Sequence, residues 1–179
     1  PWLTSYSASL EGGNWWNSLK KGEWNFVVDR YHQFAGGAML ENQTDRMLTE
    51  TFYILTVSDE NDRICQATNG YIDVVWPKEK VAFAIEALQL PKDCEGRTVD
   101  FVLVPGEFGE FPVGFNPLET SQASFSDENH VSVSVINNLN ATVSQSHVYV
   151  VLRSEDGKIV GGGFETTEMI RAGSSVNVM

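Results

Sequence analysis

Apolar residues recur in short runs along most of the chain, from about residue 24 to the C-terminus. The runs are rich in Val, Ile, Thr, Tyr and Phe, and Gly, Asp, Asn and Pro separate them. This pattern is typical of β-strands joined by turns and predicts an all-β fold. The expected strands are 24–30, 37–41, 51–58, 63–68, 81–88, 98–104, 123–126, 130–136, 147–153, 158–163 and 175–178. A helical turn is expected only in 14–21.

The pattern repeats at an offset of 95 residues, which lays 40–65 over 135–160 and 72–83 over 167–178 without gaps. Each copy has a strand, a polar turn, a longer apolar strand, an acidic hairpin tip and a strand that begins with a basic residue and Ile. We therefore predict that one sandwich-like unit occurs twice. The matched pairs are Asn42 with Asn137, Glu60 with Glu155, Arg63 with Lys158, Ile64 with Ile159, Asp73 with Glu168, Val75 with Ile170, Val81 with Val176 and Phe83 with Val178.

Three consecutive glycines, Gly161 to Gly163, follow Lys158 and could indicate a phosphate-binding loop. No Gly-Lys-Ser/Thr triplet follows them, and their counterparts in the first copy, 66–68, contain no glycine. We interpret Asp156-Gly157 as the two-residue tip of a β-hairpin. The glycines then mark a bulge or an edge strand.

The repeated unit resembles the FxLYD domain, a small immunoglobulin-like sandwich of bacterial surface proteins and lipoproteins. Its signature position at the end of the long strand is Leu-Thr-Val-Ser-Asp at 55–59 and Val-Val-Leu-Arg-Ser at 150–154. Of the signature Phe-x-Leu-Tyr-Asp, the first copy keeps the Asp and the second keeps only the Leu. The resemblance covers about 50 residues of each copy. The resemblance implies two tandem immunoglobulin-like antiparallel β-sandwiches that act as non-catalytic surface modules.

The second sandwich is expected to lack its last strand or strands. The closing strand 97–104 of the first unit would have its equivalent at residue 192, beyond Met179. Either the chain continues, or the strand-like segment 2–9 pairs at the open edge, within one chain or between protomers. An open edge would allow strand exchange or homo-oligomers. The expected organisation is an N-terminal extension with an added strand at 1–23, a first sandwich at 24–112 and an incomplete second sandwich at 113–179.

Composition narrows the classes of partner. The chain of 179 residues has 24 acidic and 12 basic side chains, a net charge of −12, and this charge disfavours nucleic acid as a partner. Its apolar runs are too short to cross a bilayer, so no transmembrane segment is expected. The first residue is Pro1 with no leader, which indicates a mature or trimmed fragment.

Two cysteines, Cys65 and Cys94, lack a CxxC spacing. They could form one disulfide in an exported protein or remain two separately buried thiols, and both alternatives stay open. The family resemblance implies an extracellular or cell-surface location.

Residues with catalytic chemistry are sparse. His32, His130 and His147 lie in no zinc-binding or nucleophile motif. A Cys–His pair could still be assembled by the fold. We predict no enzyme activity, no cofactor and no metal centre.

One acidic turn and one aromatic cluster could bind ligands. Asp59, Glu60 and Asp62 are weak candidates for Ca²⁺, although a solvated turn is the favoured interpretation. The cluster Trp15, Trp16 and Trp24 could stack on sugar rings or anchor a protein, or could pack in the core.

The expected function is a non-catalytic extracellular module that serves as a spacer or in adhesion or protein–protein interaction. Its partner would be a cell-surface protein or a glycan. The alternative is a carbohydrate-binding module that uses the tryptophans. Asn42 and Asn140 each begin a glycosylation acceptor pattern, which in a bacterial protein would only be turn residues.

Overall fold

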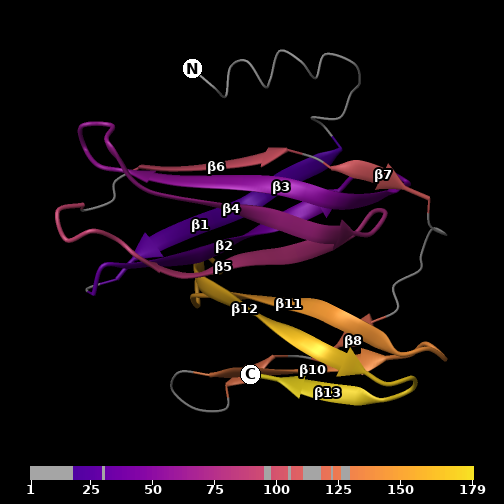
Figure 1. The fold of residues 1–179 in the computed structure, drawn as a ribbon. Coiled ribbons are helices and arrows are strands. Elements are labelled where there is room, and N and C mark those ends of the chain that lie inside the picture. Colours follow the sequence, from indigo (N-terminus) through magenta and orange to yellow (C-terminus); the bar gives the residue numbers. More distant parts are fainter. Residues whose placement is uncertain are drawn as a thin grey trace.

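All regular secondary structure in the described part of the chain consists of antiparallel β-strands (Figure 1). The computed structural model describes residues 18–29, 31–94, 98–104, 106–110, 118–121, 123–125 and 130–179. The all-β prediction is confirmed. The first unit comprises β1 (Leu19–Val28), β2 (Gln33–Asn42), β3 (Met47–Ser58), β4 (Ile64–Val75), β5 (Lys80–Gln89), β6 (Thr98–Val104) and β7 (Glu107–Gly109). The second unit comprises β8 (Leu118–Thr120), β9 (Ser124–Phe125), β10 (Val131–Asn137), β11 (Val143–Arg153), β12 (Ile159–Ile170) and β13 (Ser175–Val178).

Two sheets enclose the core of the first unit. One sheet has the order β1-β2-β5, and the other has the order β4-β3-β6, with β7 extending the β6 side of β3. Apolar side chains at alternate strand positions meet between the sheets, as expected for sheets buried on one face. Their aromatic rings interlock: Phe83 stacks on Phe101 with centroids 5.4 Å apart, and Phe26 stacks on Phe34 at 5.4 Å.

The second unit repeats this arrangement with fewer strands. Its sheets have the orders β8-β10-β13, with β9 also pairing with β10, and β11-β12. Its buried core consists of Val135, Val148, Ile170 and Val178. The described residues of this core therefore include no counterpart of the aromatic cluster of the first unit.

Strand register repeats at the offset of 95 that the sequence indicated. Leu48 pairs with Val75 on β3 and β4, and Val143 pairs with Ile170 on β11 and β12. The register then shifts at the same place in both pairs, between Val57 and Ser58 and between Leu152 and Arg153. A slip of one residue in the pairing register would turn every side chain of a strand to the other face of its sheet. The shared register therefore means that the two units place equivalent side chains on the same faces.

One buried asparagine holds the same loop in each unit. The amide of Asn42 donates to the carbonyls of Val75 at 3.0 Å and Arg46 at 2.8 Å. The amide of Asn137 donates to Ile170 at 3.0 Å and Ala141 at 2.9 Å. Both asparagines are wholly buried. Because Asn42 is buried and bonded, the acceptor pattern that begins there is a structural motif and leaves no access for a glycan.

Backbone conformations with positive φ recur at the same offset. The pairs are Glu50 with Gln145, Asp62 with Gly157, and Lys78 with Gly173. Left-handed geometry is costly for residues other than glycine, which makes chance repetition a poor explanation.

The hairpin at Gly157 has a three-residue connection, not the expected two. Ser154 N–H donates to the carbonyl of Lys158, and Gly157 N–H donates to that of Ser154. Gly157 has a φ of 84° and forms the left-handed position of a type I turn with a bulge.

Several strand boundaries differ from expectation. Residues 19–21 belong to β1, so the helical turn predicted for 14–21 is wrong there, and residues 14–17 lie outside the described residues. The start of β1 also places five residues of the expected N-terminal extension, 19–23, within the first sheet. β4 and β12 each continue seven residues past their predicted ends at 68 and 163.

Candidate functional site

Small residues bring the two units into close contact. The β11–β12 hairpin packs on the outer face of the β1-β2-β5 sheet (Figure 1). A methyl group on Gly162 would lie 2.8 Å from Cβ of Ala84, and one on Gly37 would lie 2.7 Å from Cγ1 of Val151. Gly163, by contrast, has no neighbour within 4 Å of such a methyl. The glycine run therefore includes a specific backbone contact at Gly162 as well as the strand edge that the sequence suggested.

Polar contacts accompany this junction. The amide of Asn25 donates to the carbonyl of Ile159 at 2.7 Å, and Ile159 itself is wholly buried. A salt bridge joins Arg153 to Glu23 at 2.6 Å. Because its partners are about half exposed, we assign it little net stability.

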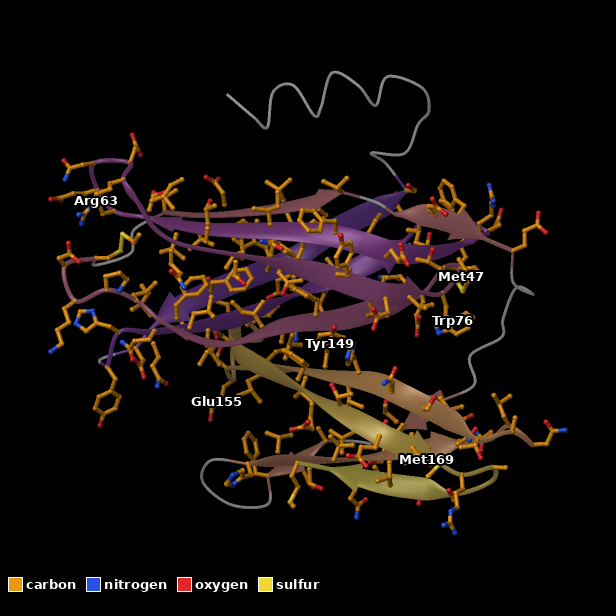
Figure 2. The ribbon with its side chains drawn as sticks, viewed as in Figure 1. Met47, Arg63, Trp76, Tyr149, Glu155 and Met169 are labelled. Atoms are coloured by element: carbon orange, nitrogen blue, oxygen red, sulfur yellow. A yellow bond between two sulfur atoms is a disulfide. The ribbon has the colours of Figure 1, made fainter. Side chains whose placement is uncertain are left out.

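Tyr149 on β11 seals one side of the first unit, as Figure 2 shows by its position between the two units. Its ring centroid lies 5.7 Å from that of Phe83 and 5.5 Å from that of Phe164. Burial raises the pKa of the phenol to about 12, with smaller contributions from Asp73 and Tyr53. The neutral phenol is therefore the form that fits the junction.

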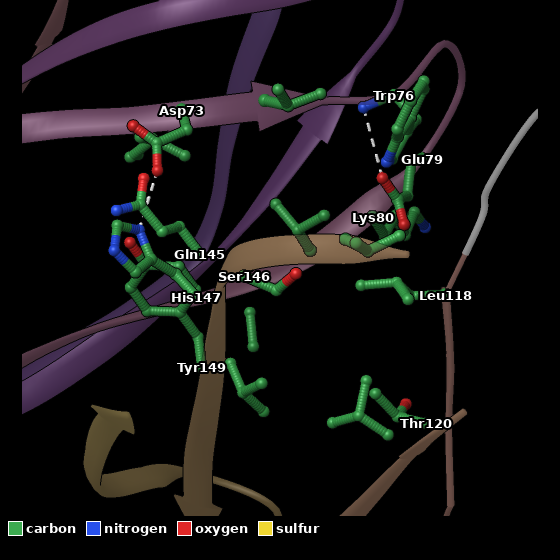
Figure 3. A pocket seen from close by; sticks show the side chains of 17 residues that line it. Asp73, Trp76, Glu79, Lys80, Leu118, Thr120, Gln145, Ser146, His147 and Tyr149 are labelled. Carbon is green, nitrogen blue, oxygen red and sulfur yellow. Dashed lines mark hydrogen bonds and ion pairs between the residues drawn. The ribbon is translucent and has the colours of Figure 1, made fainter. Parts of the chain in front are cut away.

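A cleft of about 510 Å³ lies beside this junction (Figure 3). The first unit forms one wall with the end of β4, the following turn and the start of β5. The second unit contributes β11, β8 and the β10 core residue Val135. Charged, aromatic and apolar side chains line it together, among them Asp73, Trp76, Glu79, Leu118, Val143 and His147.

Charged and aromatic groups converge on this cleft. His147 Nδ1 lies 2.7 Å from Asp73 Oδ2, so this pair bridges the two units. Glu79 accepts a hydrogen bond from the Trp76 amide at 3.2 Å, and burial raises the pKa of its carboxyl. The expected spacer or adhesion module predicts no concave pocket with convergent polar groups, and this cleft departs from that expectation.

The cleft lies where the second unit differs from the first. In the first unit, Phe108 of β7 pairs with Leu48 of β3 and is half-buried against the core. The equivalent of Leu48 in the second unit is Val143. Among the described residues, β11 has only β12 as a neighbour, and Val143 lines the cleft.

In the acidic turn that was a weak candidate for Ca²⁺, the carboxylate of Asp59 is hydrogen-bonded within the turn itself. Asp59 accepts from the backbone amides of Asn61 and Arg63, at 2.9 and 3.0 Å. Its other oxygen lies 3.0 Å from the guanidinium of Arg63. The Asn61 amide is the main cause that lowers the pKa of Asp59, and Arg63 adds to it. Glu60 and Asp62 lie in the same exposed turn.

Cys65 and Cys94 are joined by a disulfide, with Cα atoms 5.9 Å apart. The bond closes a segment of 29 residues, for which chain-entropy estimates give about 3–4 kcal/mol of stabilisation. Neither thiol is free. The Cys–His nucleophile that the sequence left open therefore lacks its thiol.

The tryptophan platform is only partly described. Trp15 and Trp16 lie outside the described residues. Trp24 is half-buried and packs 6.3 Å from Phe101, with the Lys21 ammonium 4.7 Å above its ring. Trp76, which lies outside the expected tryptophan cluster, lines the cleft.

The histidines lie on three different elements. His32 occupies the β1–β2 turn, His130 precedes β10, and His147 belongs to β11. Within the described ranges, no three His, Cys, Asp or Glu side chains are grouped so that they could hold a metal ion. The described part of the chain also has no helix of the length and hydropathy that would cross a membrane.

No family model matches the chain. A search of curated proteins likewise finds no match.

Proposed function

We propose that this chain is a non-catalytic extracellular module of a bacterial surface protein, which serves as a spacer and carries adhesive or other protein–protein contacts. The observation that carries this proposal is the close-packed junction around Gly37, Ala84 and Gly162. Backbone-to-backbone packing of this kind fixes the angle between two units, as a spacer requires, whereas flexible linkers leave domains free to move.

Two further observations support the extracellular location and the family. Disulfides persist in oxidising compartments, and Cys65 and Cys94 form one. The strand order β1-β2-β5 also agrees with an immunoglobulin-like sandwich, in which the first, second and fifth strands share a sheet. The fourth strand differs from the constant-type arrangement, because β4 pairs with β3.

The rigid junction can be tested with a matched pair of variants. Gly162→Ala inserts a methyl against Ala84, whereas Gly163→Ala inserts one into open space. We expect Gly162→Ala to weaken the junction by about 1–3 kcal/mol and to broaden the inter-unit distance distribution between spin labels. Gly163→Ala should keep the narrow distribution of the parent. A broad distribution in the parent chain would contradict the spacer role.

The location is tested separately in cells of the source organism. Alkylation without reduction should leave Cys65 and Cys94 unmodified, and an impermeant surface reagent should label the protein. Two free thiols in a protein shielded from the reagent would contradict the proposal.

Carbohydrate binding remains the alternative. Packing and the overlying Lys21 leave Trp24 poorly suited as a flat sugar platform. The alternative now depends on Trp15 and Trp16, or on Trp76 in the cleft. A titration with glycans that changes the fluorescence of the parent but not of Trp76→Phe would favour the cleft.

A further inference from the structure

We propose that one edge of β11, which has no partner strand among the described residues, is the acceptor site for a β-strand donated by another polypeptide. The donated strand would lie antiparallel to β11 in the cleft, opposite Val143 to His147. It would carry apolar side chains at alternate positions and basic ones between them. This inference rests on the proposed interaction role and names the chemistry of the partner.

The repeated register shows that β11 has fewer neighbouring strands than its equivalent, β3, among the described residues. β3 and β11 hold equivalent places, but β3 has β4 on one edge and β6 with β7 on the other. Among the described residues, β11 has β12 alone. Unpaired strand edges present hydrogen-bonding groups that another strand can satisfy.

The first unit shows what such a strand supplies. Phe108 pairs with Leu48 and Val104 pairs with Phe52, both antiparallel. At the offset of 95, the equivalents of Leu48 and Phe52 are Val143 and His147. The place that Phe108 fills in the first unit corresponds to the space beside Val143, where the cleft lies.

Core residues of the second unit face the same space. Val135 and Val148 belong to its buried core and also line the cleft, as does the half-buried Leu118. The core is therefore open along this side. An apolar side chain from an added strand would complete it, as Phe101 and Phe108 do in the first unit.

The acidic character of the second unit favours a basic donated strand. Residues 118–179 contain seven acidic and three basic side chains, so their net charge is 3 − 7 = −4. The cleft lining holds the carboxylates of Asp73 and Glu79 and the ammonium of Lys80. Asp73 lies 2.7 Å from His147, and Lys80 lies 3.8 Å from Glu41. A strand with Lys or Arg at its solvent-facing positions complements this charge, and an acidic strand is repelled.

The probes are three synthetic peptides with blocked termini. The first is Lys-Val-Lys-Phe-Lys-Val-Lys, the second has Glu in place of Lys, and the third is the first with its Val residues N-methylated, so that they cannot donate hydrogen bonds. Binding to the full chain is measured by isothermal titration, and the bound site is located by hydrogen exchange. We expect the lysine peptide to bind at least about tenfold more tightly than either of the others, because charge and ladder hydrogen bonds both contribute. It should slow exchange at Val143–His147.

Two variants locate the site on the chain. Thr120 is exposed on β8 and lines the cleft, so Thr120→Trp should block the peptide. Ser175 is exposed on β13 and does not line the cleft, so Ser175→Trp should bind like the parent. Circular dichroism is used to check that both variants are folded.

Several outcomes would overturn the inference: no binding by the lysine peptide, equal binding of the N-methylated or acidic peptide, or protection away from β11. A concentration-dependent dimer that protects Val143–His147 without peptide would assign the edge to a second copy instead. Saturable glycan binding blocked by Thr120→Trp would assign the cleft to a sugar. These results leave the spacer test at Gly162 unaffected, so failure of the inference and failure of the proposed function are distinguishable.

Discussion

β3 in the first unit and β11 in the second occupy the same position in one repeated plan, yet their surroundings differ. β3 lies between two neighbouring strands, and the sandwich around it is filled by aromatic rings. β11 has one neighbour among the described residues, and its sandwich is filled mainly by valine. The shared features are the register, the buried asparagine and the left-handed positions. These features specify the backbone path, whereas the core volume and the number of strands can vary without changing that path.

The difference in core filling gives the largest expected effect. Phe83 is 1% exposed and contacts Phe101, Tyr53 and Tyr149, whereas its equivalent, Val178, is 8% exposed. We expect Phe83→Ala to lower the free energy of unfolding by about 3–5 kcal/mol. Val178→Ala removes a smaller, less buried side chain and should cost about 1–2 kcal/mol. Urea denaturation of the two variants measures both, and equal losses would contradict the difference in packing.

The buried asparagines should behave alike, because their hydrogen bonds are equivalent. Asn42→Ala and Asn137→Ala each leave buried carbonyls without a donor, and each should cost about 2–4 kcal/mol. Hydrogen exchange should show the loss in the mutated unit. If Asn137→Ala had no effect while Asn42→Ala did, the repeated motif would not be a shared structural requirement.

The junction should respond to alkaline pH through Tyr149. The folded-state pKa of about 12 lies above the ordinary value of 10. The contribution of Tyr149 is thus fully present below pH 10 and is lost as the pH rises through about 12. Inter-unit distances should widen in that range for the parent. Tyr149→Phe should lack this transition, and the same transition in both proteins would assign it to another group.

The sequence was informative where a feature lay within one unit. The offset of 95 placed Asn42 over Asn137, and the structure gives them the same partners. Strands 98–104 and 175–178 were predicted with their observed bounds. Both segments are short, have apolar residues at alternate positions and follow turn residues, so local pattern is sufficient for them.

Local pattern failed where tertiary contacts override it. Asn69-Gly70 looked like the end of a strand, but β4 continues through both residues. A methyl on Gly70 would lie 2.9 Å from the ring of Tyr53, so this glycine makes room for an aromatic neighbour within the sheet. The strand expected at 158–163 continues in β12 through the polar run 165–168, which is largely exposed.

The cleft could not be predicted, because its walls come from both units. Asp73 and His147 meet only after the hairpin has docked, and a repeat gives no information on the docking angle. One signal was available. The small residues 35–38 on β2 and the glycine run on β12 favour close approach of two backbones, and the structure brings Gly162 close to the carbonyl oxygen of Gly36.

Hydrogen exchange of the parent chain is the most direct test of the central claim, which is that one sandwich plan occurs twice and that β11 lacks the second neighbour that β3 has. The comparison is between backbone amides at equivalent positions, Leu48–Phe52 and Val143–His147. The account predicts slow exchange at Leu48, Thr49 and Phe52, which pair on both edges of β3, and fast exchange in β11 at the amides that point away from β12. Equal, strong protection of both segments in the monomeric chain would contradict it.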